Sequence, residues 1–416
     1  MFPGKGLSVS KNTIGFDRNA RGQDNQDVRA GGPLGTGKDV ATNGPSKWAL
    51  RRESSRLLPG WSVGDCMHKV VDGMGTVTGI HVPATGSGVL AGVKRCRSVW
   101  VCPLCASQIT ERRRVELHEA LEVWRTRFGG RVVMCTYTFR HHERMSLQWM
   151  IARLNEAFRA MKKPGSYGRL LERHGIVGSV AARETKHSMV NGHHPHIHEL
   201  LFVPQNVDVA LLELELRAAW EAAAAKCGLS MNQHGFSLDD CDQHAADYVA
   251  KFGHEPAWTE AEEISKWHVK KRGSTTRQPE EHYTPFQLLR FSLEGDEEAG
   301  TLFVEYAQAF YGRAQIRWKP GFREFLGLSK EKTDDELIEE HEEVGEVMVV
   351  LHATEEWPVI VGNDAVGDFV QVLATGDMVA LCDFLGAFGI ERDPEQAPYL
   401  IDMKKRKQGW QRPMVA

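Results

Sequence analysis

The amino-acid sequence predicts an α+β fold in which antiparallel strands pack against helices. Residues 131–139 and 195–203 are short and rich in β-branched and aromatic side chains, which is typical of strands. Asn191-Gly192 lies between the second of these strands and a further apolar segment at 176–185, so a hairpin is expected there. Because helical patterns fall between and after these strands, the domain belongs to the α+β class.

The other elements of this domain follow in order along the chain. Apolar residues at helical spacing predict four helices, and a short β-rich segment follows the last of them. The helices are expected at 147–174, with an interruption at 164–165, and at 207–226, 239–252 and 298–311, and the strand at 314–318. All of these elements lie within the main domain, which we place at residues 129–328.

Three other regions flank this domain. Residues 1–58 are polar and glycine-rich without a sustained period, which predicts disorder. Residues 59–128 combine short apolar pieces, glycine-rich turns and an arginine-bearing helix at 107–127, which predicts a small β-rich module followed by a basic helix. Residues 329–416 are acidic and then mixed, which predicts a separate, mostly helical appendage.

Composition limits the class of protein. A chain of 416 residues predicts two or three folded units. With 42% hydrophobic and 25% charged residues, it is neither collagenous, wholly disordered nor membrane-spanning. No apolar run approaches the ~18 residues needed to cross a bilayer, and residues 1–19 lack the apolar block of a secretory signal. We therefore expect a cytoplasmic protein without a membrane partner.

Charge is unevenly distributed along the chain. The net charge is only −4, but residues 1–60 hold ten basic against five acidic residues, and residues 330–356 hold two basic against eleven acidic residues. A near-neutral total can therefore conceal a basic surface for an anionic partner, although both segments can also be solvated without one.

Two histidines are expected on one face of the strand at 195–203. Side chains alternate along a strand, so His196 and His198 point to the same side. Glu184 lies on the preceding strand, and one choice of hairpin register places it on the same face. Two imidazoles and a carboxylate suit Mg²⁺ or Mn²⁺ bound to a phosphodiester oxygen. The alternative is a pair of hydrogen-bonded histidines beside an ordinary strand carboxylate.

A tyrosine and a lysine share one face of the helix expected at 239–252. Tyr248 and Lys251 are spaced i, i+3, which brings both side chains to the same side. A phenol that attacks phosphorus must lose its proton, and a neighbouring ammonium stabilises the phenolate. The alternative is a surface tyrosine beside a solvated lysine.

Cysteines cluster in the N-terminal module. Cys102 and Cys105 form a C-x-x-C turn that follows Cys96, and Cys66 or His68 would complete a tetrahedral zinc site. A C-x-x-C pair can also be a redox centre, but the third nearby cysteine favours structural zinc. We therefore expect zinc at this cluster, with Cys66 as its fourth ligand.

Two basic clusters are candidate DNA-binding surfaces. One lies on the basic helix and includes Arg112 and Arg113, and the other is Lys270-Lys271-Arg272. Tryptophans are interleaved with both clusters, and cations with aromatic side chains fit a path for single-stranded or distorted nucleic acid. The alternative for each cluster is solvated surface charge.

In order and spacing, these motifs resemble the rolling-circle replication initiators of bacterial plasmids, which belong to the HUH endonuclease superfamily. The resemblance extends over roughly residues 60–340. It rests on the segments Cys96–Cys105, Thr136–His141, His194–His198, Tyr248–Lys251, Tyr283–Leu289 and Arg317–Phe322. It implies a five-stranded antiparallel sheet flanked by helices, with both histidines on a central strand.

The resemblance also implies a site-specific DNA nickase and strand transferase. Metal held by His196, His198 and Glu184 would polarise the scissile phosphate. Tyr248 would attack that phosphate with the help of Lys251, leaving a 5′-phosphotyrosine and a free 3′-OH. The partners would be single-stranded or hairpin origin DNA and the host helicase and polymerase.

Other functions are compatible with the same motifs. An HUH transposase or relaxase shares the paired histidines, and a non-catalytic regulator would use only the zinc module to bind DNA. The chain differs from some relatives at His244, four residues before Tyr248, where those relatives have a glutamate that activates water for termination. It also has no second tyrosine close to Tyr248, which disfavours a two-tyrosine mechanism.

Overall fold

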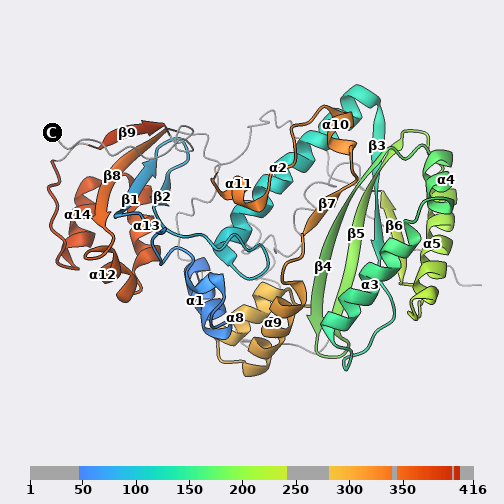
Figure 1. Ribbon diagram of the computed structural model, residues 1–416, viewed down its shortest axis with the longest axis horizontal. Coiled ribbons are helices and arrows are strands. Elements are labelled where there is room, and N and C mark those ends of the chain that lie inside the picture. The colour runs from blue at the N-terminus through green and yellow to red at the C-terminus, as the bar shows by residue number, and fades with distance from the viewer. Residues whose placement is uncertain (1–45, 241–280, 340–343, 396–397, 403–416) are drawn as a thin grey trace, which may run out of the picture. The chain divides into compact units, whose positions relative to one another are not determined.

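The structure is a computed structural model that describes residues 46–240, 281–339, 344–395 and 398–402 (Figure 1). It confirms the α+β class, because two antiparallel sheets are accompanied by helices. Among the described helices, none is long and apolar enough to cross a bilayer.

The larger sheet has five antiparallel strands, as the resemblance implies. Their order is β6-β3-β5-β4-β7, so β5 is the central strand. The strands are β3 (Gly130–Tyr137), β4 (Gly178–Ser188), β5 (Gly192–Pro204), β6 (Phe236–Asp240) and β7 (Ile316–Trp318). The short tip between β4 and β5 confirms the predicted hairpin, because Ser188 pairs with Gly192.

Glycine is required where β5 leaves this turn. Gly192 has φ +71°, in the left-handed region that side chains with a Cβ rarely adopt. A Cβ at this position would also lie 2.8 Å from the Cα of Glu143. The turn residue that signals the hairpin in the sequence therefore also allows β5 to pass close to a neighbouring loop.

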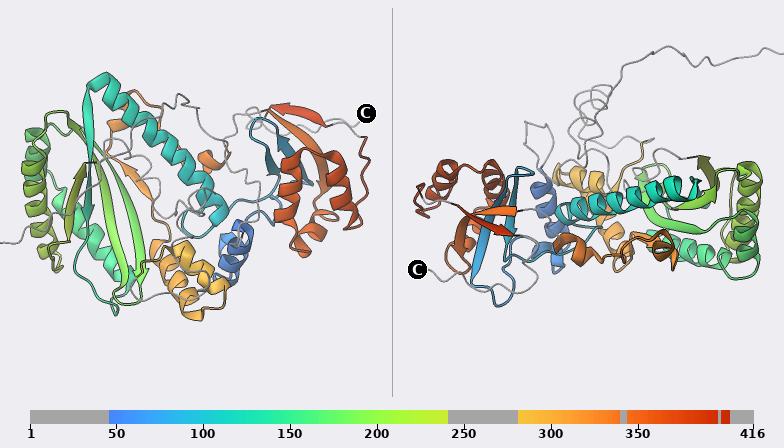
Figure 2. Two further views of the ribbon diagram at one scale, coloured as in Figure 1. Left: turned by 180° about the vertical axis from the view of Figure 1, so that it is seen from behind. Right: turned by 90° about the horizontal axis from the view of Figure 1, so that it is seen from above.

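Helices cover both faces of the five-stranded sheet (Figure 2). On one face, α2 (Pro103–Phe128) and α10 (Phe322–Leu326) pack against alternate strand residues such as Val132 and Phe202. On the other face, α3 (Leu147–Met161) and α5 (Val209–Lys226) pack in the main core, with α4 (Ser166–Arg173) beside them. Because both faces of β5 are buried, its sequence is almost continuously apolar after the histidines.

The second sheet joins segments from opposite ends of the chain. Its order is β2-β1-β8-β9, formed by β1 (Thr76–Val82), β2 (Ser87–Ala91), β8 (Val344–His352) and β9 (Tyr399–Asp402). Helices α12 (Trp357–Gly362), α13 (Val366–Thr375) and α14 (Met378–Gly386) follow β8. The C-terminal region is therefore not a helical appendage separate from residues 59–128, because its strand β8 pairs directly with β1.

Helix α1 (Lys47–Leu57) lies in the segment 1–58, so the expectation of disorder is wrong for this part of it. Ser46 caps the helix, and Glu53 accepts a hydrogen bond from Ser292 on α8 (Pro285–Leu293). The helix is held by contacts with distant residues, which its polar sequence does not reveal.

Strand β6 occupies the start of the helix expected at 239–252. Residues 239 and 240 belong to this strand, and the rest of the expected helix lies outside the described residues. Cross-strand pairing with β3 stabilises β6 despite its polar sequence. Two further helices, α9 (Glu297–Phe310) and α11 (Asp334–Glu339), precede and follow β7.

Candidate functional site

Three predicted metal ligands meet on one face of the five-stranded sheet. In the β4–β5 hairpin, Glu184 pairs directly with His196, and His198 is the next residue on the same face of β5. The Oε2 atom of Glu184 lies 3.1 Å from Nε2 of His196 and 3.4 Å from Nε2 of His198. All three side chains are buried, and one potential ligand atom from each lies within 4.8 Å of the other two. The hairpin register therefore brings the three side chains together, as the sequence analysis required.

The outer nitrogens of both imidazoles are held by hydrogen bonds. Nδ1 of His196 lies 3.1 Å from the carbonyl oxygen of His194, and Nδ1 of His198 lies 3.0 Å from Oγ1 of Thr136 on β3. A cation bound beside Glu184 would replace the protons on the two Nε2 atoms, and a proton on Nδ1 would then leave the lone pair of each Nε2 directed toward that cation. Such partners orient metal-binding histidines and select their tautomer.

The protonation states also suit a cation. Burial lowers the pKa of His198 to about 4, so its imidazole is neutral at pH 7. Burial opposes ionisation of Glu184, but the charge of His196 and hydrogen bonds from both histidines hold the pKa of this carboxyl well below its ordinary value. A carboxylate and imidazole nitrogens form a donor set that fits Mg²⁺ or Mn²⁺.

Four sulfur atoms form a second cluster. Sγ of Cys66 lies 3.5 Å from Sγ of Cys105 and 3.7 Å from Sγ of Cys102, and Sγ of Cys96 lies 3.7 Å from that of Cys105. With zinc–sulfur bonds of about 2.3 Å, the corners of a tetrahedron are about 3.8 Å apart. The spacing of the thiols, which are not joined by disulfides, therefore fits a single zinc ion.

Local structure brings these cysteines to one point. Cys102 is the N-cap of α2, Pro103 begins the helix and Cys105 lies in its first turn. The backbone at Met67 and Arg97, each next to a cysteine, has positive φ values of 62° and 56°. Non-glycine residues rarely adopt this conformation, and the two tight turns aim their cysteines at the N-terminus of α2.

A buried arginine lies beside the sulfur cluster. The guanidinium of Arg51, whose residue is 1% exposed, donates to the carbonyl oxygens of Val63 and Gly64 and lies 2.7 Å from Nε2 of His68. His68 is therefore engaged with Arg51, and Cys66 is the fourth member of the cluster. Four thiolates around a Zn²⁺ ion would carry two excess negative charges, and the charge of Arg51 would offset part of them.

The structure describes only some of the residues that were predicted to bind DNA or to act as the nucleophile. Tyr248, Lys251 and the cluster Lys270-Lys271-Arg272 lie outside the described residues. Arg112 lies on α2 and is partly exposed.

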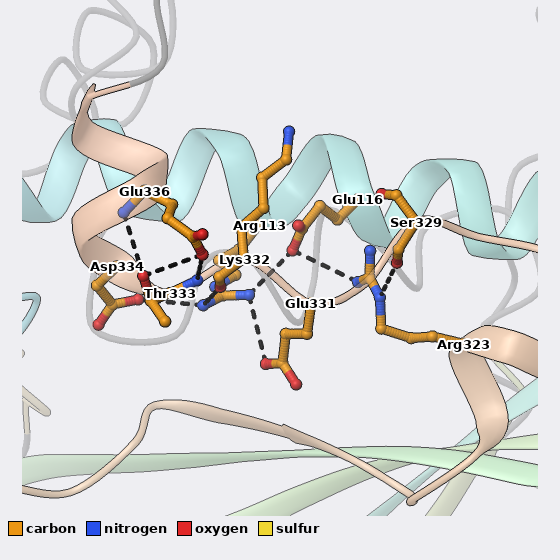
Figure 3. Close-up of polar contacts among 9 residues, drawn as sticks. All are labelled: Arg113, Glu116, Arg323, Ser329, Glu331, Lys332, Thr333, Asp334 and Glu336. Atoms are coloured by element: carbon orange, nitrogen blue, oxygen red, sulfur yellow. Dashed lines mark hydrogen bonds and ion pairs between the residues drawn. The ribbon is translucent and has the colours of Figure 1, made fainter. Parts of the chain in front are cut away.

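Arg113 is buried in a network of ion pairs instead of facing a DNA surface (Figure 3). Its guanidinium contacts Glu116 at 3.0 Å, Asp334 at 3.2 Å and Glu331 at 3.4 Å, and donates to the carbonyl oxygen of Lys332. The expectation of DNA binding is therefore wrong at Arg113. Part of the acidic segment identified in the sequence neutralises this arginine and fastens residues 331–334 to α2.

Comparisons with known proteins identify relatives with a similar sequence. Residues 87–210 match the family described as replication protein. This part of the chain is therefore similar to replication proteins. It is also 26% identical over 339 residues to "Protein rep" of Streptomyces lividans, which covers 66% of this chain and 73% of that protein. No solved structure matches.

A second relative is similar over a shorter length. The chain is 28% identical over 144 residues to a "Neomycin resistance protein" of Streptomyces cyanogenus, which covers 29% of this chain and 33% of that protein. The chain thus spans about a third of that relative. The matched residues 87–210 contain β3, β4 and β5, and hence Glu184, His196 and His198.

Other polar groups at the site were not identified as functional from the sequence. Nζ of Lys186 lies 3.5 Å from Oε1 of Glu184, and His141 contacts His194 through ring nitrogens. Lys186 could be found by period-two spacing from Glu184, which puts both on one face of β4. His141 follows the end of β3, so only the folded five-stranded sheet brings it to His194.

Proposed function

We propose that this protein is a plasmid replication initiator that nicks and rejoins origin DNA, and thereby starts rolling-circle replication. The similarity to replication proteins supports the initiator role. The observation that carries the nicking activity is the register in which Glu184 faces His196, with His198 beside it. A Mg²⁺ or Mn²⁺ ion held by these three residues would supply Lewis-acid activation of a phosphodiester.

The residues of the chain have separate tasks in this reaction. The hydroxyl oxygen of Tyr248 forms a bond to phosphorus while the bond to the 3′-oxygen breaks. The phenolic proton of Tyr248 is lost to water, and the leaving oxygen takes a proton from water and becomes a 3′-OH that a host polymerase can extend. Lys251 stabilises the phenolate, and the 5′-phosphotyrosine retains the energy needed for rejoining without ATP. The substrate is single-stranded or hairpin origin DNA.

We assign structural zinc to Cys66, Cys96, Cys102 and Cys105. The cluster ties the turns before α2 to the start of that helix, and α2 packs on the sheet face that carries the three metal-binding residues. Zinc would therefore support the catalytic face without taking part in the reaction.

Replacing Tyr248 with phenylalanine tests the nucleophile. We expect the variant to form no covalent protein–DNA adduct, because it lacks the attacking oxygen. The measurement is denaturing gel electrophoresis of the full chain after incubation with a labelled single-stranded origin oligonucleotide and Mn²⁺.

Tyr311 provides the matched control for this substitution. Its side chain is exposed, at 73%, so Tyr311→Phe should leave adduct formation unchanged. An adduct formed by Tyr248→Phe would show that another residue is the nucleophile. Cleavage of the oligonucleotide by the unaltered protein without any adduct would indicate a hydrolase that uses water.

Replacing Thr136 with valine tests the orientation of His198. The substitution keeps the shape of the side chain but removes the oxygen 3.0 Å from Nδ1. Loss of such a partner reduces metal affinity or activity by about 10–100-fold. We expect weaker Mn²⁺ binding, measured by electron paramagnetic resonance, and recovery in Thr136→Ser. Unchanged Mn²⁺ affinity in Thr136→Val would contradict this role.

A further inference from the structure

Four arginines line a cavity on the other face of the five-stranded sheet. The cavity has a volume of about 220 Å³ and is lined by Ala152, Asn155, Phe158, Arg159, Arg183, Arg313 and Arg317. These residues come from α3, β4, β7 and the segment between α9 and β7. None of them belongs to the proposed metal-binding triad, which is formed by Glu184, His196 and His198, or to the sulfur cluster.

The side chains in this cavity are anchored but not neutralised. Nε of Arg183 donates to Oδ1 of Asn155 at 2.8 Å, and its Nη1 donates to the carbonyl oxygen of Ala314 at 3.3 Å. Nε of Arg313 donates to the carbonyl oxygen of Ala309 at 2.7 Å. Within the described part of the chain, no carboxylate forms an ion pair with any of the four arginines.

Like charges in the cavity repel one another. Burial, together with the charges of Arg317, Arg313 and Arg159, lowers the pKa of Arg183 to about 10. With this pKa Arg183 is still charged at pH 7, so the cavity concentrates positive charge without compensation from the described protein residues. An anion that entered it would relieve this repulsion.

The cavity lies back to back with the metal-binding triad. Arg183 and Glu184 are consecutive residues of β4, so their side chains point to opposite faces of the sheet. Strand β7 covers the edge of β4 at Val180–Ala182, and backbone hydrogen bonds continue from Arg183 to Gln315 and between His187 and Tyr283. A DNA strand that ran from the triad to the cavity would cross this edge between those contacts, at residues 184–186.

We propose that the four arginines bind a backbone phosphate of the DNA on the face of the sheet opposite the metal-binding triad. Guanidinium groups match phosphate oxygens through paired N–H donors. The volume is several times the roughly 30 Å³ of one water molecule, so a phosphate group can enter. Arg159 and Arg317 are exposed, which leaves the site open to a continuous strand.

This inference builds on DNA as the substrate of the proposed function, but its test needs no cleavage. The full chain with Arg159→Gln and Arg317→Gln is compared with the unaltered chain. Affinity for a fluorescent single-stranded oligonucleotide is measured by anisotropy at several salt concentrations without added Mg²⁺ or Mn²⁺. We expect at least a tenfold weaker binding at 0.1 M salt. The slope of log affinity against log salt should become shallower by about 0.7, because the cavity is proposed to bind one phosphate and each lost phosphate contact contributes about 0.7.

The control removes two arginines that already have acidic partners. Arg153 pairs with Glu156 on the same helix, α3, and Arg173 pairs with Glu215. The variant with Arg153→Gln and Arg173→Gln has the same net charge as the cavity variant and should bind almost as the unaltered chain does. Equal losses of DNA affinity in both variants would show that net charge alone causes the effect, and this would overturn the proposal.

Two other outcomes would also overturn it. One is an unchanged salt slope in the cavity variant. The other is a thermal shift with inorganic phosphate that depends on the cavity while DNA binding does not, which would indicate a site for a small phosphate compound. The two proposals can fail independently of each other. A protein could bind DNA through the cavity and still form no adduct at Tyr248, and this result would contradict only the proposed function.

Discussion

Replacing His198 with alanine is expected to lower the rate of DNA cleavage about 1000-fold or more. His198 would supply one of three ligands, and its Nε2 lies 3.4 Å from Oε2 of Glu184. A bound metal contributes several kcal/mol of transition-state stabilisation, and about 4 kcal/mol corresponds to a factor of about 1000 in rate. The measurement is single-turnover cleavage of a single-stranded origin oligonucleotide with Mn²⁺.

His118 is a suitable control for this experiment. It is an exposed histidine on α2, so His118→Ala should cleave at the rate of the unaltered chain. Circular dichroism establishes that both variants are folded. If folded His198→Ala cleaved DNA at nearly the original rate, the paired histidines would have no part in the mechanism. The proposed nickase activity would then be contradicted.

Replacing Cys105 with serine is expected to have the largest effect on stability. Its sulfur is completely buried and lies within 3.7 Å of two other sulfurs of the cluster. Binding of structural zinc contributes directly to folding, so loss of a ligand should cost at least about 3 kcal/mol. At about 2–4 °C per kcal/mol for a domain of this size, Tm should fall by roughly 6–12 °C.

Zinc content and Tm are measured together on the full chain. We expect one zinc per chain in the unaltered protein and almost none in Cys105→Ser. Cys382 is a half-buried cysteine outside the cluster, so Cys382→Ser should retain both zinc and Tm. A Cys105→Ser protein that kept its zinc would show that the metal is bound elsewhere.

Most of the candidate metal site formed by Glu184, His196 and His198 could be predicted from the sequence, because this site depends on a local hairpin. Alternation along β5 predicts the shared face of His196 and His198, and the Asn-Gly signal locates the turn. The residue of β5 that pairs with Glu184 depends on the exact length of the turn. If the pairing of the strands shifted by one residue, the side chain would lie on the other face of the sheet. That length is visible only in the paired strands, where Ser188 faces Gly192.

Elements held by distant partners were less predictable. Strand β6 and helix α1 have polar sequences and are stabilised by pairing with β3 and by contacts such as that of Glu53 with Ser292. Arg113 illustrates the same limit for a single side chain. Its neighbours in sequence suggest a basic surface, whereas Glu331 and Asp334, more than two hundred residues away, determine its surroundings.

The pairing of β1 with β8 has a consequence for biosynthesis. More than 250 residues separate the two strands, so β8 leaves the ribosome long after β1. Until then, the hydrogen-bonding groups of β1 that later pair with β8 are exposed, and such an unpaired edge is prone to aggregate. A nascent or prematurely terminated chain is therefore prone to aggregate in this region, even after the five-stranded sheet has folded.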